Sequence, residues 1–248
     1  MSGFPVSAFA GSVPYSAGAV VLLLAATFIG FLIVGKHSLI DSTWGLLFAA
    51  VAIAAFACSS GHGDPVRRWL LLALPVIWGL RLAIHTGRRS IGKPEDPRYA
   101  KLVSKATGHQ NLYALRTIYL LQGLLAFLIS TPIQVGAFER GPVGPIGWVG
   151  AGVWCLGVFF ETVGDHQMEA FRRNPANKGG IIETGLWRYT RHPNYFGDAC
   201  VWWGIFAIAA DHWPGVITIY APILMTLLLT KGSGVRVLEG HLRDRPGW

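Results

Sequence analysis

Residues 17–35 read AGAVVLLLAATFIGFLIVG, an uncharged run of apolar and small residues near the start of the chain. A helix crosses the hydrocarbon core of a bilayer with about 20 apolar residues and can manage with about 17. The run therefore predicts a transmembrane helix. A cleaved signal peptide is not expected, because no Lys or Arg precedes the run and its apolar core is too long.

Similar runs follow along the chain at 42–60, 69–85, 117–138, 141–160, 193–210 and 212–230. The run at 69–85 contains one charged residue, Arg81. Of the 248 residues, 52% are hydrophobic and only 14% are charged, and the mean hydropathy is +0.44. This composition is too apolar for a soluble domain. We therefore predict an all-α, polytopic membrane protein, with about seven transmembrane helices in one bundle that forms a single domain over residues 1–248.

Basic residues are distributed unequally between the connections. Of the 21 Lys and Arg residues, only Arg67, Arg68 and Arg140 follow the second, fourth and sixth runs, and the other 18 lie in or beside the remaining connections and the C-terminal tail. By the positive-inside rule, we expect the N-terminus outside and the C-terminus in the cytoplasm, in a bacterial inner membrane. The net charge of +8 is thus explained without nucleic-acid binding.

A polar segment at 185–198, GLWRYTRHPNYFGD, ends inside the sixth apolar run. Charged and polar side chains at a membrane boundary need a ligand or one another to offset their desolvation. Alternatively, the basic residues meet lipid headgroups while Trp187, Tyr189 and Tyr195 form an interfacial aromatic belt. Lipid anchoring requires neither Asn194 nor Asp198, so the segment is also a candidate binding site.

An acidic stripe precedes this segment on the helix predicted from the fifth run. Glu161, Asp165 and Glu169 recur every four residues and share one helical face, where like charges repel one another. We expect a cationic or hydrogen-bond-donating group to face them. Pairing with Arg172 and Arg173 is the structural alternative, and binding the ribose hydroxyls of a nucleotide is the functional one.

Several common sites are not indicated by the sequence. The histidines are scattered and lack the spacing of a di-iron centre, so no metal is expected. Gly147, Gly150, Gly152 and Gly157 do not form a GxGxxG motif after a strand, and they suit close helix packing instead. Because no Rossmann domain is indicated, the membrane bundle itself would have to hold any dinucleotide.

Together these segments resemble the DUF1295 branch of the steroid 5-alpha-reductase-like membrane proteins over about residues 35–248. The motifs that carry the resemblance are WGLRL at 78–82, EDPRY at 95–99, LQG at 121–123, ETVGDHQMEAF at 161–171, GLWRYTRHPNYFGD at 185–198, WWG at 202–204, GSGVRVLE at 232–239 and RPGW at 245–248. The resemblance implies a seven-helix bundle that binds NADPH on its cytosolic side, mainly through residues 145–248. It also implies hydride transfer to an activated carbon–carbon double bond of a lipid drawn from the bilayer.

The resemblance also implies site residues. The expected cofactor contacts are Asp165, Gln167, Lys178, Arg188, Arg191, His192, Asn194, Tyr195, Asp198, Arg236 and Glu239. Asp41 and Tyr195 are the candidate catalytic residues, although a helix N-cap is an equally good role for Asp41. Trp78 stands where steroid reductases carry a catalytic tyrosine, so a steroid substrate is not implied.

Two other functions remain open at this point. RHPNY also occurs in S-adenosylmethionine-dependent methyltransferases that modify membrane lipids or isoprenyl groups, which gives an alternative cofactor. In the second alternative, the chain is a non-enzymatic lipid-binding protein whose polar cluster stabilises the bundle. The sequence does not indicate an oligomeric state.

Overall fold

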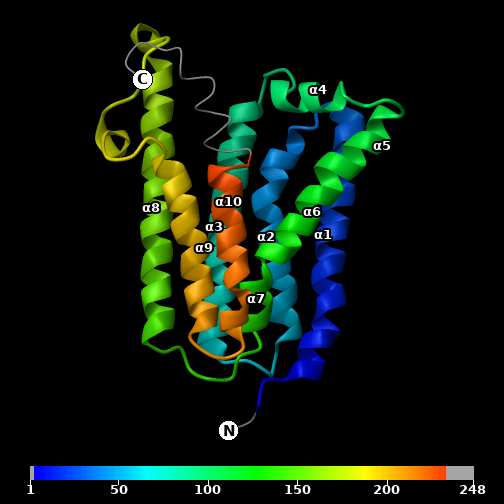
Figure 1. Ribbon diagram of the computed structural model, residues 1–248, viewed down its shortest axis with the longest axis vertical. Coiled ribbons are helices and arrows are strands. Elements are labelled where there is room, and N and C mark those ends of the chain that lie inside the picture. Colours follow the sequence, from blue (N-terminus) through cyan, green and yellow to red (C-terminus); the bar gives the residue numbers. More distant parts are fainter. Residues whose placement is uncertain (1–2, 233–248) are drawn as a thin grey trace.

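The computed structural model describes residues 3–232. The chain folds into one elongated bundle of helices (Figure 1). The principal helices are α1 (Val6–Val34), α2 (Leu39–Cys58), α3 (Pro65–Ser90), α8 (Pro145–Arg173), α9 (Pro193–Ala210) and α10 (Tyr220–Thr230). One further rod consists of α5 (Gln110–Ala114), the π-helical turn η1 (Leu115–Leu120) and α6 (Leu121–Ile129). Short elements connect these: α4 (Pro97–Val103), α7 (Thr131–Gly136), η2 (Pro175–Asn177), η3 (Gly185–Arg188) and η4 (Gly215–Ile219).

Five of the described helices are long and apolar enough to cross a membrane: α1, α2, α3, the rod Gln110–Ile129 and α8. The prediction of an all-α membrane protein is confirmed, since the described residues contain no strand. The sixth predicted span corresponds to α9, whose first turns carry Asn194 and Asp198, and the seventh to the shorter apolar helix Gly215–Thr230. The count of seven spans therefore stays a prediction.

Local sequence signals set the helix ends. Asp64 caps α3, because its carboxylate accepts a hydrogen bond from the Arg67 backbone N–H at 2.9 Å and Pro65 occupies the first helical position. A glycine ends the first helix: α1 stops at Gly35, whose φ of 76° lies in the left-handed region. The Gly35 N–H donates to the carbonyl of Phe31 at 2.7 Å and so closes the last turn.

An aromatic cluster joins three helices in the core. Phe48 of α2, Trp78 of α3 and Trp202 of α9 are all fully buried. Their rings lie close, with 4.4 Å between the centroids of Phe48 and Trp202 and 5.5 Å between those of Trp78 and Trp202. Pairs at such separations contribute about 0.5–1.5 kcal/mol beyond the area they bury. The cluster thereby fixes α3 and α9, which both carry site residues.

Glycines allow α8 and α9 to approach closely. A Cβ atom on Gly157 of α8 would lie 2.5 Å from the Gly197 carbonyl oxygen of α9, and one on Gly150 would lie 2.7 Å from that of Gly204. Only glycine permits such contact between helix backbones. The packing role expected for Gly150 and Gly157 is confirmed. Gly152 has no neighbour within 4 Å of the same position, so that expectation was wrong for it.

The two ends of the bundle differ in chemistry. α4, α5 and the connection between α8 and α9 lie at the end opposite the N-terminus (Figure 1). At the N-terminal end, buried Arg67 donates to the Pro142 carbonyl and to Asp211, both at 3.1 Å, and lies 3.6 Å from Glu139. Burial raises the pKa of Glu139 to about 8, although nearby Arg67 acts in the opposite direction.

Candidate active site

Helix α3 contributes to the walls of two adjacent cavities near the end that carries the long connections. We call the first the apolar cavity; it encloses about 880 Å³ and is bounded mainly by α2, α3, the segment 93–102 with α4, α6 and α10. The second, the basic cavity, encloses about 1240 Å³ and lies mainly between α3 and α8. Tyr195, in the first turn of α9, lines both.

Large apolar side chains form one part of the lining of the apolar cavity. They are Trp44, Leu82, Leu102, Leu121, Leu125, Met225, Leu228 and Leu229, from α2, α3, α4, α6 and α10. Leu121 is also half exposed on a membrane-spanning rod. A cavity of this size and lining suits an apolar ligand with a few polar groups.

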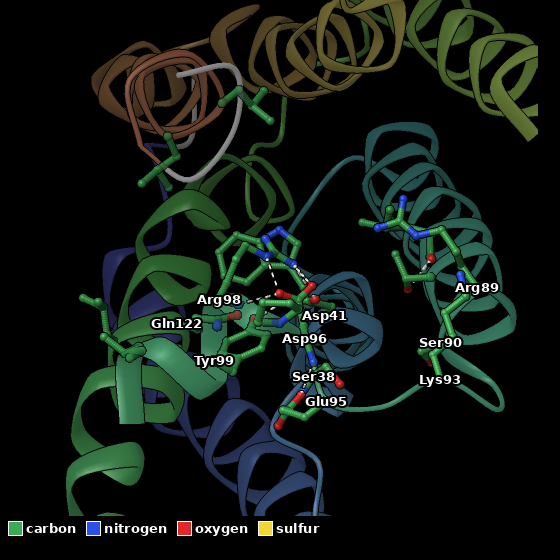
Figure 2. A pocket seen from close by; sticks show the side chains of 18 of the residues that line it. Ser38, Asp41, Arg89, Ser90, Lys93, Glu95, Asp96, Arg98, Tyr99 and Gln122 are labelled. Carbon is green, nitrogen blue, oxygen red and sulfur yellow. Dashed lines mark hydrogen bonds and ion pairs between the residues drawn. The ribbon is translucent and has the colours of Figure 1, made fainter. Parts of the chain in front are cut away.

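A hydrogen-bonded group of three side chains lies on one wall of the apolar cavity (Figure 2). The Tyr99 hydroxyl donates to Oδ1 of Asp41 at 2.5 Å, and the Arg98 guanidinium donates to Oδ2 of Asp41 at 3.0 Å. Arg98 also donates to both carboxylate oxygens of Asp96. Ser38, not Asp41, is the N-cap residue of α2, so the alternative N-cap role for Asp41 was wrong.

Burial and charge set the protonation of this group. Burial would raise the pKa of Asp96, but its hydrogen bonds from Arg98 outweigh that effect and lower it. Hydrogen bonding to Asp96 raises the pKa of Arg98 further above its already high value. Burial, together with the adjacent carboxylate of Asp41, raises the pKa of Tyr99. Tyr99 is therefore a neutral phenol and Arg98 a fixed cation.

Glu95 connects the EDPRY segment, which carries Arg98 and Tyr99, to the start of α2 by hydrogen bonds. Its carboxylate accepts hydrogen bonds from the backbone N–H groups of His37 and Ser38, the latter at 3.1 Å. It also accepts from the Asp96 N–H at 2.8 Å. Charge-assisted hydrogen bonds of this kind typically contribute about 1.5–3 kcal/mol each. The EDPRY segment is thus held against α2, which places Tyr99 beside Asp41.

The basic cavity is lined by an excess of cations. They are Arg81, Arg88, Arg89, Lys93, Arg98, Arg172 and Arg173, against the carboxylates Asp96, Asp165 and Glu169. His85, His166, Trp187 and Asn194 add hydrogen-bonding and aromatic surface. Arginine forks bind phosphate oxygens in pairs, and carboxylates accept hydrogen bonds from sugar hydroxyls. The cavity therefore suits a phosphorylated, polar ligand.

The acidic stripe of α8 meets α3. Arg81 donates to Oε2 of Glu161 at 2.6 Å and to Oδ2 of Asp165, and the Trp78 indole donates to Oε1 of Glu161 at 2.9 Å. The expectation that donors face the stripe is confirmed, although the donors come from α3 and not from the next turn of α8. Only Glu169 has the neighbour expected from sequence, in its 2.6 Å ion pair with Arg173.

The predicted site residues fall into three groups in the structure. Those that line one or both cavities are Asp41, Asp165, Asn194, Tyr195 and Asp198. Those that line neither of these cavities are Gln167, Lys178, Arg188, Arg191 and His192. Arg236 and Glu239 lie outside the described residues.

The segment 185–198 is attached to α8 by specific hydrogen bonds. Gln167 accepts from the Leu186 N–H at 3.0 Å, and the Trp187 indole donates to the Gly164 carbonyl at 3.0 Å. His192 is buried and stacks on Tyr195, with 5.4 Å between the ring centroids. In the structure, Gln167 and Trp187 anchor the segment, and Asn194, Tyr195 and Asp198 face the cavities.

Comparison with known proteins agrees with this arrangement of motifs. A family model described as "Protein of unknown function (DUF1295)" matches residues 27–247. The chain belongs to the DUF1295 family. This match includes both cavities and every motif used above except the final tryptophan of RPGW.

Among curated proteins, the chain is similar to an uncharacterized protein of Schizosaccharomyces pombe, with 22% identity over 197 residues. The matched region covers 70% of this DUF1295 chain and 57% of the yeast protein. The chain thus spans little more than half the length of that relative. No solved structure matches the chain.

Sequence reasoning missed several lining residues of this DUF1295 protein. The missed basic residues Arg88 and Arg89 come from the end of α3 and Lys93 follows that helix, whereas Arg98 and Tyr99 come from the EDPRY segment. One available signal is the period of α3, because Arg81, His85 and Arg88 recur at helical spacing. That spacing indicates a polar face on an otherwise apolar helix. It does not indicate which helix this face meets.

Proposed function

We propose that the protein is an integral membrane, NADPH-dependent reductase that transfers a hydride to an activated carbon–carbon double bond of a lipid. The observation that carries the proposal is the pair of adjacent cavities, one basic and one apolar, which share Tyr195 in their walls. A reductase of a lipid needs a polar site for a dinucleotide beside an apolar site for its second substrate. The resemblance to steroid 5-alpha-reductase-like proteins supports the same function.

The residues of the basic cavity fit a phosphorylated dinucleotide. Its arginines match the phosphates, and Asp165 matches a ribose hydroxyl. Arg81 and His85 both contact Oδ2 of Asp165, which orients this carboxylate in the cavity wall. The volume of about 1240 Å³ exceeds that of typical drug-sized sites, as a dinucleotide requires.

When bound, NADPH would supply the hydride, since that chemistry belongs to the cofactor. The protein's own residues would position the two reactants and exclude water. Within the described residues, no hydrogen bond engages the Tyr195 hydroxyl, which leaves this phenol able to donate a hydrogen bond or a proton where the cavities meet. Asp41 would act indirectly, by orienting Tyr99 and Arg98 in the wall of the apolar cavity.

The test is the identity of the nucleotide that co-purifies with the protein in mild detergent, determined by mass spectrometry. We expect NADP(H), and we expect NADPH oxidation when a total lipid extract of the source membrane is added. S-adenosylmethionine would instead support the lipid methyltransferase alternative. Absence of any nucleotide, together with no NADPH binding by the purified protein, would favour a non-enzymatic lipid-binding role.

A further inference from the structure

Two basic side chains lie in the wall of the apolar cavity, where a neutral lipid would not need them. Arg89, in the last turn of α3, and Lys93, just after the helix, both line this cavity with Ser90. Figure 2 shows these three residues on the side facing the Asp41, Arg98 and Tyr99 group. The space between the two sides therefore has cations on each wall.

The helical period of α3 assigns Arg89 to this cavity. Leu82, Thr86 and Arg89 recur at spacings of four and three residues and all line the apolar cavity. Arg81 and Arg88 lie on the adjoining stripe and line only the basic cavity. Arg89 lies at the border and reaches both, but it continues the apolar stripe.

Three of the four carboxylates that line the apolar cavity are already engaged by other groups; the fourth is Asp198. Asp41 and Asp96 accept hydrogen bonds from Arg98, and Glu95 accepts backbone N–H groups. Within residues 3–232, neither Arg89 nor Lys93 has a carboxylate within ion-pair distance, and Arg89 acts on Asp96 only at longer range. Both residues are exposed, so the two cations stay hydrated without a ligand and are accessible to an anion that binds in the cavity.

We propose that Arg89 and Lys93 bind the oxyanion headgroup of an acidic lipid, a carboxylate or a phosphate, whose chain occupies the leucine-lined part of the apolar cavity. The inference rests on the proposed function in taking this cavity as the lipid site. It adds the class of substrate: a charged, chain-like lipid in place of a neutral sterol. Leu125, Met225 and Leu228 would contact the chain.

The phosphates of a nucleotide are the competing source of the same chemistry. The basic cavity has Arg88 and Arg173 for that purpose, and neither of them lines the apolar cavity. A dinucleotide seated there has cations without Arg89 and Lys93. The cations of the apolar cavity, Arg89, Lys93, Arg98 and Arg172, all lie on the rim that it shares with the basic cavity, so a lipid headgroup has no other cation to bind there.

Matched lipid pairs test the proposal. The purified protein in neutral-lipid nanodiscs is titrated with oleate and oleyl alcohol, and with geranylgeranyl diphosphate and geranylgeraniol. We expect each acid to bind about tenfold tighter than its alcohol, as one charge-assisted contact provides. The double variant Arg89→Gln/Lys93→Gln should remove this difference and leave alcohol affinity unchanged, whereas Lys101→Gln, an exposed change outside both cavities, should preserve it.

Retained alcohol binding shows that the double variant is folded, and the single variants Arg89→Gln and Lys93→Gln should each lose part of the preference. Equal affinity of acids and alcohols in the unmodified protein would overturn the proposal. So would a preference that survives in the double variant. Displacement of the acids by NADPH or inorganic pyrophosphate, with loss of NADPH binding in the double variant, would assign the two cations to the nucleotide and also overturn it. Failure of the unmodified protein to bind NADPH would remove the reductase function while leaving the acid preference measurable.

Discussion

At the scale of single residues, Arg81 organises the polar interior. It lies on an apolar helix and is 17% exposed, yet it contacts both Glu161 and Asp165 of another helix. Removing one member of a buried ion pair leaves the other charge uncompensated. Arg81 therefore couples the stability of the α3–α8 contact to the shape of the basic cavity.

Asp165, a partner of Arg81, can be compared with Glu169, which lies one turn further along α8 and pairs with Arg173. Asp165→Asn should lower the free energy of unfolding in the absence of nucleotide by about 1–3 kcal/mol, because a charged hydrogen-bond acceptor is lost while Glu161 still holds Arg81. Glu169→Gln should cost about 0.5 kcal/mol or less, since its pair with Arg173 is exposed. Thermal unfolding in detergent measures both. Equal effects would show that the contact of Arg81 with Asp165 adds no stability.

Glu139 gives a pH dependence at the other end of the molecule. Its pKa in the folded state, about 8, lies above the ordinary value of 4.5. A raised pKa contributes stability that is fully present below about pH 4.5 and is lost as the pH rises through about 8. The stability advantage of the wild type over Glu139→Gln should therefore shrink between pH 5 and pH 9. Melting temperatures of both proteins across this range provide the measurement, and parallel curves would contradict the expectation.

At the scale of elements, the glycine contacts between α8 and α9 hold the site together. Tyr195 and Asp198 lie in the first two turns of α9, and Asp165 lies on α8. Separation of the two helices would therefore move both walls at which the cavities meet. The sequence spacing of the glycines indicated close packing, but it did not distinguish the glycines that face α9 from Gly152, which does not.

Two substitutions on α8 test this contact. Gly157→Ala should destabilise the protein by about 1–3 kcal/mol, because the new Cβ meets backbone atoms of α9. Gly152→Ala adds the same methyl group where nothing lies within 4 Å, so it should be neutral or stabilise the helix by up to about 1 kcal/mol. Thermal unfolding of the two variants is the measurement. Similar melting temperatures would show that α8 and α9 have room to separate.

At the scale of the whole molecule, membrane orientation remains a prediction from charge. A reporter fused after Trp248 should report the cytoplasm, and one inserted near Gly61 should report the outside. Gly61 lies in the turn between α2 and α3, with φ of 74°, and a Cβ there would meet nothing within 4 Å. An insertion there is expected to be tolerated. The same side for both reporters would show that the number of spans differs from the predicted count by one.

The sequence by itself determined the class of the protein and indicated where five of its long apolar helices lie. Run length and composition suffice for this, because a membrane helix satisfies its own backbone hydrogen bonds and is recognised within about 20 residues. Motif order likewise indicated the DUF1295 family, and the segment 185–198 contained four residues that line the cavities. These are Trp187, Asn194, Tyr195 and Asp198.

Only the tertiary structure decided which polar groups meet. Arg81 and Glu161 are 80 residues apart, and Asp41 and Tyr99 are 58 apart. Such pairings depend on how the helices rotate and pack, and packing is governed by the whole set of contacts and not by local spacing. The two cavities and the part played by Tyr99 follow from that packing. The period of α3 indicates a polar face, but it does not indicate which helix that face meets.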